Sequence, residues 1–128
     1  MTVQEHMMFY TQAKGIQRES RIQEIDDILN QLGLDIHRSK LAGALSGGNK
    51  RKLSVAIAVI GRPPLILLDE PSAGMDPEAR RLMWKVVAAL CSDCAVVFTT
   101  HDMEEAEALS TKLGIMTKGG VLQCLGSA

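Results

Sequence analysis

The sequence predicts an α/β protein in which a helical part is followed by part of an α/β core with parallel central strands. Two observations predict this class. Up to Gly61 the apolar residues recur at helical spacing, whereas beyond the Arg62–Pro64 break short apolar runs alternate with helical segments. A strand–helix–strand–helix order is typical of parallel strands. We therefore expect residues 1–61 to form a helical subdomain and residues 62–128 to belong to the core.

Two helices are expected at the amino-terminal end. The first spans residues 3–14 and stops at Gly15, and the second runs from Arg18 to Leu32 and ends at Gly33. The residues expected to form their apolar stripes are Val3, Met7, Met8 and Phe9 in the first helix and Ile22, Ile25, Ile28, Leu29 and Leu32 in the second.

A loop and a third helix follow. Residues 39–49 are rich in small side chains and predict a loop, within which Ser46 is placed to be the N-cap of a helix that reaches Gly61. The Arg62–Pro63–Pro64 segment ends this helical part, because proline lacks the amide hydrogen and restricts the residue before it.

The chain beyond the break alternates between strands and helices. Leu65–Leu68 is wholly apolar, which predicts a strand buried on both faces. The remaining expected elements are a helix over residues 77–90, a second buried strand over 95–100, a short acidic helix over 103–109, and a hairpin whose strands, 113–116 and 121–124, flank the turn 117–120.

Composition excludes two classes of function. The 14 Lys and Arg residues are balanced by 15 Asp and Glu residues, so the chain lacks the clustered basic charge of a nucleic-acid-binding protein, and we expect no nucleic-acid partner. The longest apolar run, Val55–Ile60, is far shorter than the roughly 18 residues that a membrane-spanning helix needs. We therefore expect no transmembrane segment within the chain.

Of the three cysteines, Cys91, Cys94 and Cys124, the first two are expected to be structural. Cys91 and Cys94 have the spacing of a redox pair or of half a zinc site, but no second Cys or His pair is present to complete a tetrahedral metal site. This pair lies between an apolar helix and an apolar strand, where small buried thiols are common.

Asp69 and Glu70 follow the first apolar strand directly. In an open α/β sheet, ligands bind beyond the carboxyl ends of the strands, so both carboxylates are expected at a binding edge. One carboxylate there can hold hydrated Mg²⁺ on a nucleotide, and the adjacent one can orient and polarise the attacking water. Two acids that merely end a strand in solvent remain the competing interpretation of this pair alone.

His101 follows the second apolar strand, within Thr99–Asp102. If the two strands are parallel neighbours, His101 lies at the same edge as Asp69 and Glu70. An imidazole there can contact a γ-phosphate or position the water that Glu70 activates. This joint placement makes a simple strand-ending histidine the weaker interpretation.

Leu45–Asn49 has the composition of an anion-binding loop at the start of a helix. Free amides and the positive end of the helix dipole bind anions, and Gly47 and Gly48 allow a phosphate to approach the backbone closely. Gly43–Lys50 superficially matches the phosphate-binding loop G-x₄-G-K-[ST]. However, Asn49 interrupts the motif and no buried strand precedes it, so this segment is not a Walker A motif.

Four motifs in order resemble the nucleotide-binding domain of ATP-binding cassette (ABC) transporters, namely LSGGN, LILLDEP, SAGMDP and TTHDMEEAE. The resemblance covers nearly all of the chain. It implies half of a P-loop NTPase-like (RecA-like) core, preceded by an ABC-type α-helical subdomain. The opening TVQEHMMFYTQAKGI, the GMDP and the MEEAEAL are most similar to eukaryotic subfamily A transporters, associated with lipid export, or to the related bacterial drug and polysaccharide exporters.

The resemblance also implies a role for each candidate site residue. Glu70 and His101 would be catalytic, Asp69 would hold Mg²⁺ through water, and Asp76 would contact nucleotide from the D-loop, which spans residues 72–76. The residues implied to bind ATP as the signature loop are Leu45, Ser46, Gly47, Gly48 and Asn49. Asn49 departs from the usual LSGGQ but keeps a side-chain amide.

The family arrangement implies two partners. Two cassettes pair head to tail around ATP and Mg²⁺, and a transmembrane domain meets the helical subdomain at the cytosolic face of a membrane. The Walker A loop and the Q-loop glutamine would both lie upstream of Met1, so we expect the isolated chain to be an amino-terminally truncated fragment without appreciable ATPase activity. Two alternatives stay open, a non-catalytic degenerate fragment and a soluble ABC protein that serves as a partner-binding module.

Overall fold

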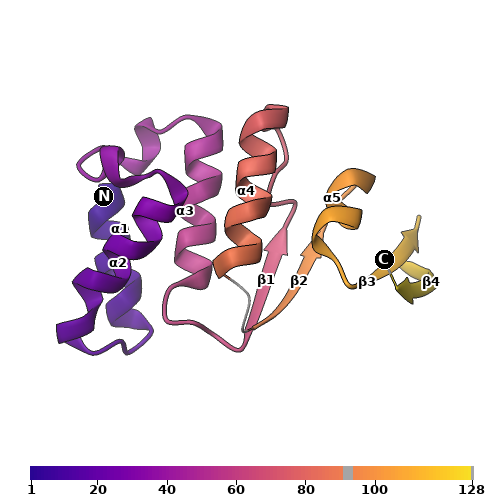
Figure 1. The fold of residues 1–128 in the computed structure, drawn as a ribbon, viewed down its shortest axis with the longest axis horizontal. Helices are drawn as coiled ribbons and strands as arrows, with labels where there is room; N and C mark the ends of the chain where they lie inside the picture. Colours follow the sequence, from indigo (N-terminus) through magenta and orange to yellow (C-terminus); the bar gives the residue numbers. More distant parts are fainter. Residues whose placement is uncertain (91–93, 128) are drawn as a thin grey trace.

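The computed structural model describes residues 1–90 and 94–127. Figure 1 shows helices α1 to α3 at one end of the molecule, α4 beside α3, and the β3–β4 hairpin at the opposite end. The elements in order are α1 (Val3–Ala13), α2 (Arg18–Leu32), the short 3-10 turns η1 (Asp35–His37) and η2 (Ala42–Ala44), α3 (Gly47–Val59), β1 (Leu65–Asp69), α4 (Pro77–Leu90), β2 (Ala95–Thr99), α5 (Met103–Leu109), β3 (Lys112–Thr117) and β4 (Val121–Ser127).

The strands form two separate two-stranded sheets. β1 and β2 are parallel, with Leu65 opposite Ala95 and Asp69 opposite Thr99, whereas β3 and β4 pair as an antiparallel hairpin. The predicted α/β class with parallel central strands is therefore confirmed. Because β1 and β2 point the same way, the residues that follow Asp69 and Thr99 emerge at one edge of the sheet (Figure 1).

Several helix ends have clear capping chemistry. Thr2 starts α1 with a capping box, in which its hydroxyl accepts from the Glu5 amide at 3.2 Å and the Glu5 carboxylate accepts from the Thr2 amide at 2.7 Å. These hydrogen bonds with Thr2 lower the pKa of the Glu5 carboxyl. Gly33 ends α2 in the left-handed conformation at φ 63°, and Ser46 is the N-cap of α3, both as the sequence predicts.

One continuous aliphatic core joins the helical part to the sheet. Its side chains come from one face of each of the helices α1, α2, α3 and α4 and from one face of β1. Removal of these apolar side chains from water stabilises the packing of the helices on the strand. The fully buried members of the core include Met7, Leu29, Leu34, Ile60 and Met83.

Three side chains expected in the helical stripes are exposed instead. Phe9 is 57% exposed and Ile22 is 60% exposed, and Met8 is also accessible. Successive helical residues are rotated by about 100°, so Met8 and Phe9 turn away from the buried face that Val3 and Met7 share. In α2 the buried stripe starts at Ile25, so its first turn, with Ile22, lies beyond the packed surface.

The prediction that both parallel strands are buried on two faces is wrong. Ile66 and Leu68 are buried, but Leu65, Leu67 and Val97 are 51%, 69% and 58% exposed. Side chains alternate between the two faces of a strand, and the helices that contact this sheet cover only the face of Ile66 and Leu68. Among the described residues, the two-stranded sheet is thus covered by helices on one face and exposed on the other.

The described cysteines differ in their surroundings, since Cys94 packs against the core. Cys91 of the predicted Cys91–Cys94 pair lies outside the described residues, and Cys124 is exposed on β4. Within residues 1–90 and 94–127, none of the helices combines the length and the apolar character required to cross a membrane.

Lys14 connects α1 to the far end of α3. Its Nζ donates to three backbone carbonyl oxygens at the carboxyl end of that helix, at 2.7 Å for Ile57, 3.0 Å for Ala58 and 2.9 Å for Ile60. Partial burial lowers the pKa of the Lys14 ammonium, and the nearby Glu24 carboxylate acts in the opposite direction. A cation at this position satisfies carbonyls that have no partner within the helix and complements the negative end of its dipole.

We expect Lys14→Met to lower the free energy of unfolding of the chain by about 1 kcal/mol, because the three carbonyls lose a charged donor while the apolar stem is kept. Urea denaturation monitored by circular dichroism measures the change. Lys85→Met is the matched control, since Lys85 is an exposed residue of α4. Equal stabilities of the two variants would contradict the capping role.

Candidate functional site

The predicted carboxylates and histidine lie together at the carboxyl ends of β1 and β2. Asp69 is the last residue of β1 and is paired with Thr99, the last residue of β2. Glu70 and His101 follow these two positions, so the parallel register brings them to the same edge. This is the arrangement that the two apolar strands predict when they are neighbours.

Glu70 and His101 contact each other directly. The Nδ1 atom of His101 lies 2.8 Å from the Oε2 atom of Glu70, with the histidine side chain 80% exposed and the glutamate side chain 33% exposed. A carboxylate can only accept, so in this contact the hydrogen is on Nδ1, and Nε2 is the ring nitrogen left for another partner. The pair therefore presents a carboxylate and an imidazole together at an accessible surface.

The backbone of Glu70 is held in an uncommon conformation. Its amide donates to the Thr99 carbonyl oxygen at 3.2 Å and to the Thr99 hydroxyl at 3.1 Å. Its φ angle is +46°, a region that side-chain-bearing residues rarely occupy and that costs about 1 kcal/mol or more. The contacts with β2 fix this turn and direct the Glu70 side chain towards His101.

Asp69 is positioned by the neighbouring strand. The Thr99 hydroxyl donates to Asp69 Oδ1 at 2.5 Å while it accepts from the Glu70 amide, so one side chain orders both acidic positions. Asp69 is exposed and offers carboxylate oxygens, the ligand type that suits Mg²⁺, which in nucleotide sites takes one or two carboxylates together with phosphates and water. Across the described residues no cluster of three or more Asp, Glu, His or Cys side chains forms an all-protein metal cage.

A small pocket of about 100 Å³ adjoins this pair. Its lining includes Glu70, Arg80, His101, Asp102 and Glu105, together with the loop that follows β1. Asp76 ends that loop and accepts from the Ala79 amide at 2.9 Å, so it caps the first turn of α4 and is exposed. The structure thus gives Asp76 a local capping contact and places it outside the lining of this pocket.

The LSGGN segment forms a separate surface at the start of α3. Leu45 is buried, whereas Ser46 is exposed and its hydroxyl accepts from the Asn49 amide at 3.3 Å. Neither Gly47 nor Gly48 has a positive φ, and a Cβ added at either would meet nothing within 4 Å. The fold itself therefore does not require glycine at these positions, although glycine disfavours a helix.

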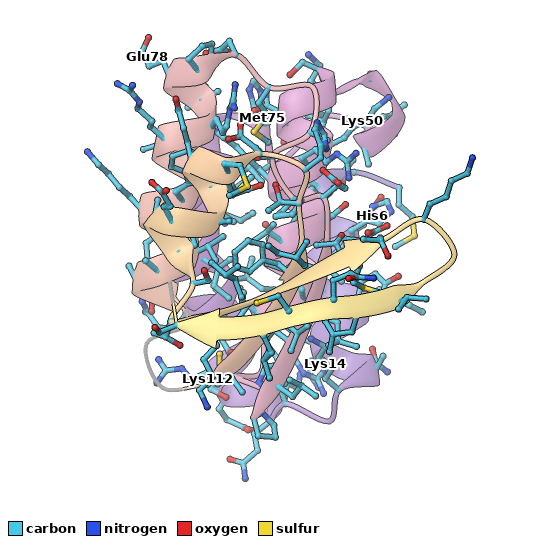
Figure 2. All side chains as sticks on the ribbon, turned by 90° about the vertical axis from the view of Figure 1, so that its right-hand side faces the viewer. His6, Lys14, Lys50, Met75, Glu78 and Lys112 are labelled. Carbon is cyan, nitrogen blue, oxygen red and sulfur yellow. The ribbon has the colours of Figure 1, made fainter. Side chains whose placement is uncertain are left out.

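The signature segment and the carboxylate pair are not brought into one pocket. Figure 2 shows Lys50, in the first turns of α3, at the same end of the molecule as Met75, in the loop after β1, and Glu78, at the start of α4. The pocket beside Glu70 contains no residue of the Leu45–Asn49 segment. The structure therefore presents two separate sets of candidate residues.

Several residues around the site were missed by the sequence analysis. Arg80 forms an ion pair with Asp102, and Trp84 donates from Nε1 to Glu105 at 2.9 Å, with Glu105 only 1% exposed. Asp102 also caps α5, which its position just before the MEEAEAL helix could have indicated. The burial of Glu105 depends on α4 packing against α5, and no local pattern signals it.

The comparisons with known proteins agree with this geometry. The family model described as ABC transporter matches residues 1–73. The chain is 49% identical over 128 residues to the retinal-specific phospholipid-transporting ATPase ABCA4 of Bos taurus, a match that covers 99% of this chain and 6% of that protein. It is 43% identical over 128 residues to the glucosylceramide transporter ABCA12 of Homo sapiens, covering 99% of this chain and 5% of that protein.

The fold is also that of solved ABC ATPases. A structure titled "Structure of ATP binding subunit of ABC transporter" superposes with a TM-score of 0.85 at 23% sequence identity, covering 99% of this chain and 53% of that one. The chain thus spans about half of that subunit and a small fraction of the full transporters. With the ABC family model covering more than half of its residues and subfamily A relatives matching along almost all of it, the chain belongs to the ABC transporter family.

Proposed function

We propose that this chain is part of the ATPase domain of an ABC transporter that uses ATP hydrolysis to move lipids across a membrane. The contact between His101 and Glu70 at the ends of two parallel strands carries the ATPase proposal, because it pairs a general base with a phosphate-facing imidazole. The lipid substrate is suggested by the relatives named as phospholipid and glucosylceramide transporters.

At the first site, each carboxylate has its own role. Glu70 orients and polarises the attacking water, and His101 holds the position of Glu70 and faces the γ-phosphate through its free ring nitrogen. Asp69, which the Thr99 hydroxyl orders, would hold Mg²⁺. When bound, Mg²⁺ would supply positive charge against the phosphate oxygens.

At a second site, the signature segment contacts the ATP held by the partner. Ser46 and the amides of Gly47 and Gly48 lie at the open start of α3, where the helix dipole favours an anion. Leu45 and Asn49 flank these donors, and Asp76 contacts nucleotide from the D-loop. The separation of this segment from the Glu70 pocket supports a head-to-tail pair of nucleotide-binding domains, in which each chain contributes to both ATP sites.

The helical subdomain, residues 1–61, is proposed to bind the transmembrane domain at the cytosolic face of the membrane, and residues 62–128 to belong to the ATPase core. Exposed apolar side chains on the helical part support this, with Phe9 57% and Ile36 80% accessible. Burial of such side chains against a partner would be favourable, because it removes apolar surface from water.

The test compares the intact protein, purified in lipid vesicles, with the isolated 128-residue chain. We expect Mg²⁺-dependent ATP hydrolysis by the intact protein and no appreciable turnover by the isolated chain, since Asp69, Glu70 and His101 do not by themselves cradle the phosphates. Release of inorganic phosphate measures both. An intact protein without ATP turnover would show that the ATPase proposal is wrong. Turnover by the isolated chain would show that the expected inactivity of this chain is wrong.

A further inference from the structure

Two polar contacts join α4 to α5 beside the Glu70 and His101 pair. Arg80 and Trp84 lie one turn apart on α4, and their partners, Asp102 and Glu105, lie at the start of α5. The two contacts are therefore stacked along the same side of α4. They clamp the beginning of α5 at two successive points.

The Trp84–Glu105 contact is buried. Glu105 is 1% exposed, and its Oε1 atom accepts from Trp84 Nε1 at 2.9 Å. A buried carboxylate that lost its donor would retain its desolvation penalty without compensation. This contact therefore holds α5 at a defined position against α4 and disfavours sliding between the two helices.

The Arg80–Asp102 pair acts directly beside the histidine. Asp102 follows His101 in the chain, and its Oδ1 atom accepts from the amides of Glu104 at 2.9 Å and Glu105 at 3.4 Å. Its other carboxylate oxygen pairs with Arg80, and both side chains are only about a quarter exposed, at 26% for Arg80 and 23% for Asp102. Asp102 is thereby fixed from two sides.

The His101 ring itself has little support. It is 80% exposed, and within the described part of the chain its one side-chain hydrogen bond is with Glu70. The position of the imidazole then depends on its backbone, which is set by Asp102 and α5. Arg80, Asp102 and Glu105 also line the small pocket that contains Glu70 and His101. Loss of the contacts between α4 and α5 would therefore change the shape of that pocket.

We propose that Arg80 and Trp84 are positioning residues for His101, acting through Asp102 and Glu105 rather than through contact with nucleotide. The inference rests on the proposed ATPase function. Asp76, at the end of the loop that would face the partner cassette, caps the first turn of α4, so the contacts between α4 and α5 also connect this loop to the histidine. A small displacement of a catalytic group can lower turnover by about a hundredfold without loss of substrate binding.

The experiment measures kcat and KM for ATP with the intact protein in lipid vesicles. We expect Arg80→Met to lower kcat by roughly ten- to a hundredfold while KM for ATP changes less than about twofold. Arg80→Lys, which keeps the charge, should recover part of the loss. Trp84→Phe removes the donor to Glu105 and should give the same split between kcat and KM.

Two comparisons separate positioning from general destabilisation. Arg81→Met is the matched control, because Arg81 is the adjacent, exposed arginine of α4 and forms no ion pair with any described residue; it should retain wild-type kcat. Adding Arg80→Met to a His101→Ala protein should cause no further loss, since the group being positioned is already absent. An additive loss in that background would overturn the positioning role.

The outcomes also distinguish this inference from the proposed function. If Arg80→Met and Trp84→Phe both retain the kcat of Arg81→Met while Glu70→Gln is inactive, the positioning role is wrong and the ATPase proposal stands. If Arg80→Met does not fold, as shown by the absence of a cooperative melt, the kcat and KM of Arg80→Lys and Trp84→Phe are compared with those of Arg81→Met instead. A wild-type protein without ATP turnover overturns both.

Discussion

Glu70→Gln is expected to reduce ATP hydrolysis by the intact protein at least about a hundredfold, with KM for ATP nearly unchanged. The amide matches the carboxylate in size, and its oxygen can still accept from His101 Nδ1, so the contact at 2.8 Å can persist. What is lost is the ability to accept a proton from the attacking water. Steady-state phosphate release in lipid vesicles measures the effect.

Glu78→Gln is the control for this substitution. Glu78 lies at the exposed start of α4 and is absent from the lining of the pocket beside Glu70, so the same chemical change there should leave kcat unaltered. Retention of more than about half of the wild-type kcat by Glu70→Gln would remove Glu70 from the role of general base.

Gly47→Asp is expected to abolish ATP-driven turnover while leaving the fold as stable as before. A Cβ at Gly47 meets nothing within 4 Å. A carboxylate in the first turn of α3 interacts favourably with the helix dipole and stabilises the helix by about 0.5 kcal/mol. The same charge repels a phosphate at the open start of the helix. Activity and stability should therefore change independently, which a merely structural glycine would not allow.

Gly47→Ala separates charge from size in this experiment. Alanine fills the same open space without charge, so it should retain far more turnover than Gly47→Asp, and both variants should show a melting temperature at or above that of the wild type. Phosphate release and thermal melts of the intact protein provide the two readouts. Full activity of Gly47→Asp would exclude the signature segment from the second ATP site.

The elements that local patterns predict well are those whose chemistry is local. Ser46 as an N-cap, Gly33 as a helix end and the parallel pairing of β1 with β2 follow from capping, backbone freedom and the alternation of strands with helices. The meeting of Glu70 with His101 then follows from the parallel register, so the main candidate pair could be anticipated.

The features that were missed depend on contacts distant in the chain. Leu65 and Leu67 have the same apolar sequence whether helices cover one face of the sheet or two, so their exposure could not be anticipated. Glu105 belongs to an acidic pair that is typical of a solvated helix, yet Trp84 from α4 buries it. Thr99 resembles any strand threonine until Asp69 is placed beside it.

The positive φ of Glu70 means that selection for stability and selection for activity favour different residues at this position. Glycine adopts this backbone geometry without strain, so a screen for heat resistance alone would favour the substitution Glu70→Gly over any residue with a reactive side chain. A screen for growth that depends on transport would favour the carboxylate and tolerate the strained turn. The amino acid found at this position in evolved populations would therefore report which of the two pressures the protein had experienced.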